Sequence, residues 1–287
     1  MARIIGGIGT THVPAIGSAI AKGLQNDSYW KPFFDGFHHI HKWLDRERPD
    51  IVVAFSNDHG LNFFLDKLPT FAIGAAAEYG SEDEGWGIPV SHAAKGIPDL
   101  SWHIINAAVG DEFDITMCQE MLIDHALTIP LSLMWPGDSG WPVRIVPIGI
   151  NTVQHPLPSV KRCLELGRSV GRAIDSFPGD AKVLILGTGG LSHQLDGERA
   201  GFINKDFDKL CMDKLVTDPD ALTRYSIRDV VEQAGSQGVE LLNWVAMRGA
   251  LTGTVTEGHR NYHIPISNTA AATMLFENNA AAARTAA

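Results

Sequence analysis

The chain has 287 residues, of which 45% are hydrophobic and 20% charged, as expected of a globular protein with an ample core. Its formal net charge of −10 argues against nucleic acid or an anionic membrane as a main partner. Membrane spans need about 18 or more consecutive apolar residues, and we expect neither such a span nor a signal peptide. The three scattered cysteines predict reduced thiols and a cytoplasmic location rather than a disulfide framework.

Short apolar runs alternate with amphipathic segments along the chain. Strands are predicted at residues 2–9, 51–55, 71–74, 113–118, 143–150 and 182–186, and helices at 29–47, 99–109, 124–134, 158–177, 204–216, 227–234 and 238–247. This order predicts an α/β fold over residues 1–287. We expect a single domain with a mostly parallel or mixed sheet, helices on its flanks, and an active site at the strand carboxyl ends. The alanine-rich tail, about 279–287, is expected to fray.

Three of the predicted strands are each followed closely by a histidine. His12 follows the first strand, His59 follows the strand at 51–55, and His193 follows the strand at 182–186 through a glycine turn. Open α/β sheets bind their ligands at this edge. The glycine turn could instead be a plain turn or a phosphate loop. No Gly-Lys-Ser/Thr follows, however, and the glycine spacing differs from a dinucleotide fingerprint.

A fourth candidate, Glu240, lies in the apolar segment 238–247. A carboxylate in such a setting is costly unless it is paired or binds a metal, although Glu240 could also face solvent or pair with Arg248. For any single histidine, a structural hydrogen-bonded role is the more common outcome. Two histidines and one carboxylate together suit non-haem Fe(II) oxygenases, and the same set also serves catalytic zinc. A zinc-dependent hydrolase and a non-catalytic subunit therefore remain alternatives.

A set of short segments spread over nearly the whole chain forms a specific pattern. The segments are 11–15, 57–59, 69–74, 83–87, 98–104, 124–125, 187–195, 200–205, 238–241 and 263–270. In these segments the chain resembles the LigB-type family of extradiol ring-cleavage dioxygenases, and within it the catalytic beta subunits that cleave protocatechuate.

The resemblance implies roles for five residues. His12, His59 and Glu240 would bind Fe(II), His193 would be the acid/base, and His125 would be a second polar group over the substrate. The implied reaction is extradiol (meta) cleavage of a carboxylated catechol by O₂. The main expectation is protocatechuate, which would give 4-carboxy-2-hydroxymuconate semialdehyde. Cleavage of gallate, methylgallate or an aminophenol is the alternative.

Two further expectations concern the substrate carboxylate and a partner subunit. Ser267 and Asn268 are small polar residues that could donate hydrogen bonds to the ring carboxylate. The long excursion at 78–98 carries Trp86 between glycines and is a candidate contact surface. Because the family often uses a small helical alpha subunit, the resemblance implies a heteromer, with two copies of each subunit.

Overall fold

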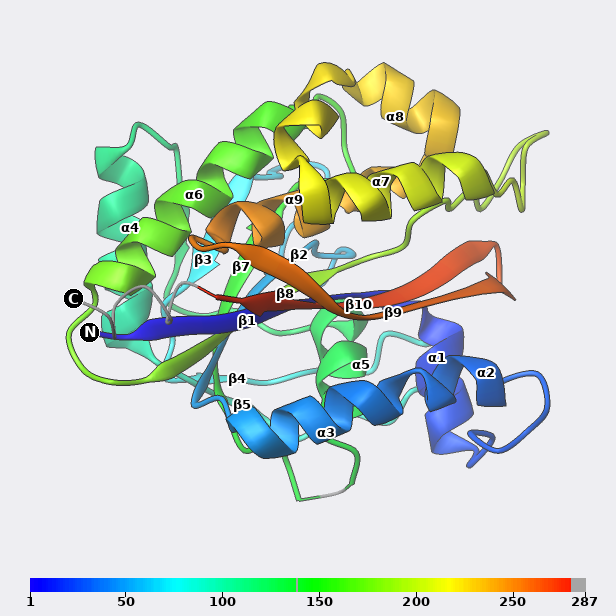
Figure 1. The fold of residues 1–287 in the computed structure, drawn as a ribbon, viewed down its shortest axis with the longest axis horizontal. Helices are drawn as coiled ribbons and strands as arrows, with labels where there is room; N and C mark the ends of the chain where they lie inside the picture. The colour runs from blue at the N-terminus through cyan, green and yellow to red at the C-terminus, as the bar shows by residue number, and fades with distance from the viewer. Residues whose placement is uncertain (138, 280–287) are drawn as a thin grey trace.

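The computed structural model describes residues 1–137 and 139–279, which contain a ten-stranded mixed sheet with helices on both faces (Figure 1). The α/β fold class predicted from the sequence is therefore confirmed. Apart from residue 279, the tail expected to fray lies outside the described residues. No described helix is both long and apolar enough to cross a membrane.

The strands run in the order β4-β5-β7-β2-β8-β1-β10-β9, with β3 paired to β7 and β6 paired to β3. Strands β7, β2, β8 and β1 are parallel neighbours, whereas β10 is antiparallel to β1 and to β9. The strand bounds are β1 (Arg3–Thr10), β2 (Ile51–Ser56), β3 (Phe71–Gly74), β4 (Glu78–Tyr79), β5 (Ala94–Gly96), β6 (Thr116–Cys118), β7 (Arg144–Ile150), β8 (Lys182–Thr188), β9 (Val255–Ile266) and β10 (Thr269–Asn278).

Helices α1, α2, α3 and α5 cover one face of the sheet, and α4, α6, α7, α8 and α9 cover the other (Figure 1). Their bounds are α1 (Pro14–Ala21), α2 (Lys31–Asp35), α3 (Phe37–Glu47), α4 (Pro98–Gly110), α5 (His125–Met134), α6 (Val160–Ser176), α7 (Lys205–Thr217), α8 (Ile227–Ala234) and α9 (Leu241–Ala250), with 3-10 turns η1 (Pro219–Arg224) and η2 (Gly238–Glu240).

The apolar runs of the central strands are explained by burial on both faces. In β2, Val53 and Phe55 pack in the core beneath α4, α6 and α9, whereas Val52 and Ala54 pack beneath α1, α3 and α5. Successive side chains of a strand point to opposite faces, so both sets must be apolar when helices cover both. This two-sided core fixes the edge at which the parallel strands end.

Three predicted elements differ from the structure. The helix predicted at 29–47 is divided into α2 and α3 at Gly36, where a Cβ atom would collide with the side chain of Asn261 on β9. The excursion at 78–98 contains the short strands β4 and β5 rather than loop alone. The segment 238–247 begins with the turn η2, so Glu240 occupies the N-cap of α9 instead of its body.

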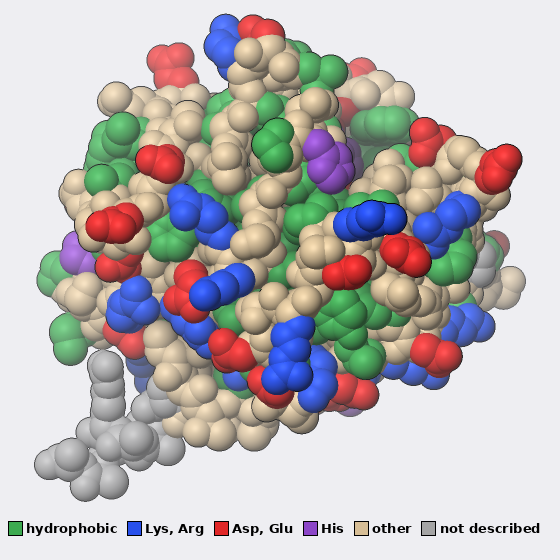
Figure 2. All heavy atoms as spheres, turned by 90° about the horizontal axis from the view of Figure 1, so that it is seen from above, with side chains coloured by type: hydrophobic (Ala, Val, Ile, Leu, Met, Phe, Trp, Pro, Cys, Tyr) green, Lys and Arg blue, Asp and Glu red, His purple; other side chains and the backbone are tan. Residues whose placement is uncertain are grey.

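The face seen in Figure 2, above the sheet of Figure 1, carries acidic and basic side chains interspersed with apolar ones. On helix α6, for example, Arg168 forms ion pairs with Glu165 and Asp220. Exposed pairs of this kind contribute about 0–1 kcal/mol each. The residues predicted to be functional lie at the strand ends rather than among these ion pairs.

Candidate metal centre and active site

Three side chains predicted to act together do converge at one edge of the sheet. The parallel strands β1 and β2, which lie on either side of β8, end at the same edge of the sheet and deliver His12 and His59, while η2 delivers Glu240. Glu240 Oε1 lies 3.4 Å from His12 Nε2 and 3.7 Å from His59 Nε2. The side chains of His12 and Glu240 are only 4% and 7% exposed, whereas that of His59 is 26% exposed, so the cluster is buried at His12 and Glu240 and reaches solvent at His59.

Both histidines are held through the ring nitrogen that faces away from Glu240. Nδ1 of His12 lies 3.1 Å from Thr188 Oγ1, and Nδ1 of His59 lies 2.9 Å from Asp124 Oδ2. An ionised carboxylate only accepts hydrogen bonds, so His59 donates from Nδ1, and its Nε2 is the nitrogen directed toward Glu240. His12 Nε2 is buried and has no hydrogen-bond partner among the described residues. Histidines that ligate metals are oriented in this manner by outer partners.

Glu240 is a buried, ionised carboxylate. Its Oε2 accepts a hydrogen bond of 2.8 Å from the Gly190 amide. Burial opposes the charged form, but His12 and His59 outweigh burial and hold the pKa of Glu240 well below its usual value. The glycine turn permits this approach, because Gly189 has φ +136° and a Cβ atom there would lie 2.5 Å from Glu240 Cβ.

The electrostatics of this cluster fit a divalent cation. Burial opposes protonation of His59, yet the Asp124 and Glu240 carboxylates raise the pKa of His59 to about 10. The site thus favours positive charge, and it offers two imidazole nitrogens and a carboxylate oxygen at close range. Fe(II) and zinc both accept this donor set. The buried, unpartnered Nε2 of His12 is the observation that most directly favours metal binding at this site.

His125, expected from the resemblance to be a second polar group over the substrate, lies beside this cluster. Its ring stacks on that of His59 at a centroid distance of 4.0 Å and meets the ring of His12 edge-on at 5.5 Å. The three rings offer nitrogens within 4.8 Å of one another. Burial lowers the pKa of His125, and the positive charge of His59 lowers it further. A neutral imidazole therefore lies beside the candidate metal ligands.

Two carboxylates that sequence reasoning did not assign to the site orient these histidines. Asp124 stands at the start of the helix predicted at 124–134 and is its N-cap, since Oδ1 accepts from the Ala126 amide, but its Oδ2 also accepts from the backbone and ring of His59. Glu84 accepts from the backbone and lies against the ring Nδ1 of His125. Glu84 and Asp124 also form a cation-compatible group with His125. Their oxygens are engaged by these donors, so we assign them an orienting role.

His193 lies beyond the glycine turn, as predicted. Its backbone is fixed, because its amide donates to Ala234 at 2.7 Å and its carbonyl accepts from Gln237 and Gly238. Its ring Nδ1 is buried without a hydrogen-bond partner in the described part of the chain. Burial lowers the pKa of His193, and Glu240 and His12 lie near enough to influence it. A neutral ring that is not held by a partner suits proton transfer.

The turn that carries His193 is anchored by a buried aspartate that the sequence did not reveal. Asp208 Oδ1 accepts from the amide and hydroxyl of Ser192 at 2.9 and 2.8 Å, and Oδ2 accepts from the Tyr262 hydroxyl at 2.7 Å. Burial raises the pKa of Asp208 to about 6 despite these donors. The only sequence signal was an acidic residue in the first turn of a helix, which is usually a surface position.

Ser267 and Asn268 form the two-residue turn between β9 and β10, and Ser267 has φ +55°. The turn lies beside the His193 loop, because His193 bridges to Thr269 and the Asn268 amide donates to Leu195 at 3.4 Å. Ser267 itself is exposed. Their predicted contact with a substrate carboxylate stays a prediction.

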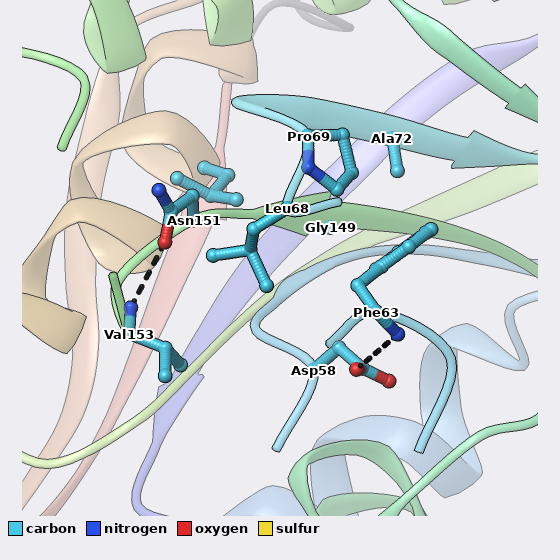
Figure 3. A pocket seen from close by; sticks show the side chains of 9 residues that line it. Asp58, Phe63, Leu68, Pro69, Ala72, Gly149, Asn151 and Val153 are labelled. Atoms are coloured by element: carbon cyan, nitrogen blue, oxygen red, sulfur yellow. Dashed lines mark hydrogen bonds between the residues drawn. The ribbon is translucent and has the colours of Figure 1, made fainter. Parts of the chain in front are cut away.

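A separate small pocket adjoins the loop after β2 (Figure 3). Its lining is mainly apolar, and consists of Asp58, Phe63, Leu68, Pro69, Ala72, Gly149, Ile150, Asn151 and Val153. Asp58 accepts from the backbone amides of residues 60–63, and Asn151 accepts from Val153. These bonds shape two loops, so we interpret the pocket as a structural junction.

Fold and site together define an α/β protein with a candidate centre of two histidines and one carboxylate at the strand carboxyl ends. Residues 6–272 match the family described as the catalytic LigB subunit of aromatic ring-opening dioxygenase. The chain therefore belongs to the LigB family, as the resemblance in its sequence implied.

Similar proteins include two kinds of ring-cleavage enzyme. Gallate dioxygenase of Pseudomonas putida is 42% identical over 179 residues, which cover 62% of this chain and 52% of that protein. The 2,3-dihydroxyphenylpropionate/2,3-dihydroxicinnamic acid 1,2-dioxygenase of Photorhabdus laumondii is 34% identical over 185 residues, which cover 64% of this chain and 54% of that protein. The chain thus spans about half the length of these two curated relatives.

A solved structure shares the fold. An uncharacterized protein of Escherichia coli K12 superposes with a TM-score of 0.59 at 14% identity, covering 94% of this chain and 99% of that one. At this identity the match concerns the fold alone.

Proposed function

We propose that this chain carries the catalytic site of a metal-dependent extradiol dioxygenase that cleaves a dihydroxylated or trihydroxylated benzoate. The single observation that carries the proposal is the convergence of His12 Nε2 and His59 Nε2 on the buried carboxylate Glu240. His12, His59 and Glu240 would hold Fe(II). Such a triad occupies one face of a metal and leaves the opposite face for substrate and O₂.

Gallate has more support than protocatechuate, which was the main expectation from the sequence. The similar protein from P. putida is named for gallate, and other relatives are named for 2,3-dihydroxyphenylpropionate. The named substrates share adjacent ring hydroxyls and a carboxylate. We therefore propose a substrate of that chemical class and place gallate first.

The chemistry divides between the metal and the protein. Bound Fe(II) would supply coordination of the ring oxygens and a path for electrons from ring to O₂. The protein orients the two imidazole rings through Thr188 and Asp124. It also excludes water from His12 and Glu240, because both side chains are buried. A site closed to water strengthens each of these electrostatic contacts.

Proton movement is assigned to His193, with His125 as a second polar group over the substrate. A catechol must lose a hydroxyl proton as it binds, and a proton must return when the ring opens. Burial lowers the pKa of His193 and so favours its neutral ring, and Nδ1 of that ring is a buried, unpartnered nitrogen that can take the proton. His125 presents a second neutral imidazole that can hydrogen-bond the other hydroxyl. Ser267 and Asn268 would bind the ring carboxylate.

We further propose a partner for this chain, on its resemblance to catalytic beta subunits that act together with a small helical alpha subunit. A small helical alpha subunit, in an assembly with two copies of each chain, would complete the walls of the site. Co-expression with a candidate small subunit should raise turnover. Full activity of the isolated chain as a monomer would contradict this part of the proposal.

The central experiment is O₂ uptake by the chain loaded anaerobically with Fe(II) and offered gallate, protocatechuate and unsubstituted catechol. We expect uptake with the carboxylated substrates, and loss of most bound iron in Glu240→Ala. Glu82→Ala, at an exposed residue, is the control. Full iron occupancy in Glu240→Ala would refute the triad. Stoichiometric zinc without O₂ uptake would favour a hydrolase, and an absence of bound metal would favour a non-catalytic subunit.

A further inference from the structure

The excursion at 78–98 contributes a carboxylate to the site. Glu84 Oε1 accepts from the His125 backbone amide at 2.8 Å, and Glu84 Oε2 lies 2.6 Å from His125 Nδ1. The side chain of Glu84 is 17% exposed and that of His125 is 3% exposed. One side chain from the excursion thus binds both the backbone and the ring of a residue beside the candidate metal ligands.

This contact determines where the ring proton of His125 resides. A neutral imidazole carries one proton, and an ionised carboxylate can only accept. Because Glu84 faces Nδ1, the proton is held on Nδ1 and Nε2 retains its lone pair. Glu84 and His125 repeat the arrangement of Asp124 and His59, because Asp124 accepts in the same way from the backbone and Nδ1 of His59.

The excursion is docked by other contacts as well. Ser18 Oγ on α1 donates to the Trp86 carbonyl at 2.9 Å, and the Trp86 ring lies 6.4 Å from the His125 ring. Ile88 packs against Gly17, where a Cβ atom would approach Ile88 to 2.9 Å. Glu84 therefore reaches His125 only while the excursion lies against α1 and α5.

We propose that Glu84 is a positioning residue, which sets the tautomer and angle of His125 so that Nε2 accepts a hydrogen bond from a substrate hydroxyl. The catalytic consequence rests on the proposed function, whereas the contact between Glu84 and His125 is independent of it. Because Glu84 belongs to the excursion, this positioning role makes assembly of the site depend on docking of the excursion. Residues 78–98 then act through His125 without touching the reacting atoms.

Glu84→Gln tests this with little change of shape. If the Gln oxygen stays on the His125 amide, its NH₂ group faces Nδ1 and moves the imidazole proton to Nε2. If the amide is reversed, the backbone N–H of His125 loses its acceptor. Loss of an outer partner of this type typically costs 10–100-fold. We expect kcat to fall by about that factor while KM and iron content change little.

The readout that needs no activity is ¹⁵N NMR of histidine-labelled, metal-free protein, in which protonated and bare ring nitrogens resonate far apart. His125→Gln identifies the relevant signals. The wild-type protein should show Nδ1 protonated, Glu84→Gln should lose that pattern, and the matched control Glu82→Gln should keep it. Glu84→Asp, which retains the carboxylate, should restore the pattern and part of the turnover even if Glu84→Gln unfolds readily.

Two results would overturn the inference. One is an unchanged His125 signal in Glu84→Gln. The other is wild-type turnover in that variant although the tautomer has changed. A wild-type protein that cleaves no catechol, but whose His125 tautomer still depends on Glu84, would leave the positioning role standing and refute the proposed function instead.

Discussion

Replacement of Asp124 by Asn should weaken metal binding while leaving the fold in place. Asp124 Oδ2 accepts from the His59 amide at 2.8 Å and from His59 Nδ1 at 2.9 Å, and Oδ1 accepts from the Ala126 amide at 2.9 Å. The residue is 4% exposed, so water cannot replace these bonds. Asn keeps the size of the side chain but turns one acceptor into a donor.

The free-energy cost of Asp124→Asn depends on which contact keeps the one remaining oxygen of the substituted side chain. With the oxygen on His59, α5 loses its N-cap, which costs about 0.5–2 kcal/mol. With the oxygen on Ala126, the NH₂ group faces Nδ1 and drives the His59 proton onto Nε2, the nitrogen that faces Glu240. Loss of such an outer partner reduces metal affinity by about 10–100-fold, or about 1.4–2.7 kcal/mol.

Anaerobic titration of the metal-free chain with Fe(II) measures the affinity, and thermal unfolding of the same samples separates it from stability. Asp99→Asn is a suitable control, because Asp99 is also acidic, lies in the first turn of a helix and is exposed. If Asp124→Asn bound Fe(II) as tightly as the wild-type chain, the argument that outer carboxylates orient the ligands would fail.

Three further predictions concern the proton, the anchor of the glycine turn and the substrate. His193→Phe should keep its iron and lose turnover by about 10²–10⁴-fold, as measured by O₂ uptake; loss of iron would instead make His193 a ligand. The folded-state pKa of Asp208, raised to about 6, stabilises the fold at low pH, and this contribution should disappear as pH rises from about 4 through 6. The free energy of unfolding of Asp208→Asn, measured with urea, should therefore rise relative to that of the wild-type chain by up to about 3 kcal/mol over that range. A difference that stays constant with pH would contradict the assignment. Ser267→Ala should raise KM for gallate more than for unsubstituted catechol, and equal effects would place the carboxylate elsewhere.

The sheet and the approximate place of the site could be predicted because both depend on local sequence. Apolar runs at 51–55 and 182–186 required cover on both faces, and the histidines that followed them had to lie at one edge of a parallel sheet. The helix predicted at 124–134 also depends on local sequence and is confirmed, with Asp124 as its N-cap. The break at Gly36 could not be predicted, because it depends on Asn261, which is distant in sequence.

The outer partners of the site could not be predicted for the same reason. Glu84 lies in a stretch rich in acidic residues and glycine, where a solvated carboxylate is the usual outcome. Its partner His125 is 41 positions away, and Asp208 is 16 positions from Ser192. No periodicity or short motif encodes these pairs. They become visible only when burial and the direction of each hydrogen bond are known.

The strands and the loops fix different properties of this site, which explains why its chemistry would depend on loops that are not part of the sheet. Strand ends deliver His12 and His59 with little freedom, because the backbone of the parallel strands is fixed by the two-sided core. Ring tautomers are set elsewhere: by Asp124 before α5, and for His125 by Glu84 in the excursion. A metal needs bare nitrogens and a substrate needs an acceptor, so each requires its carboxylate in place. The sheet therefore places the rings, and the loops around it decide which nitrogen of each ring is available.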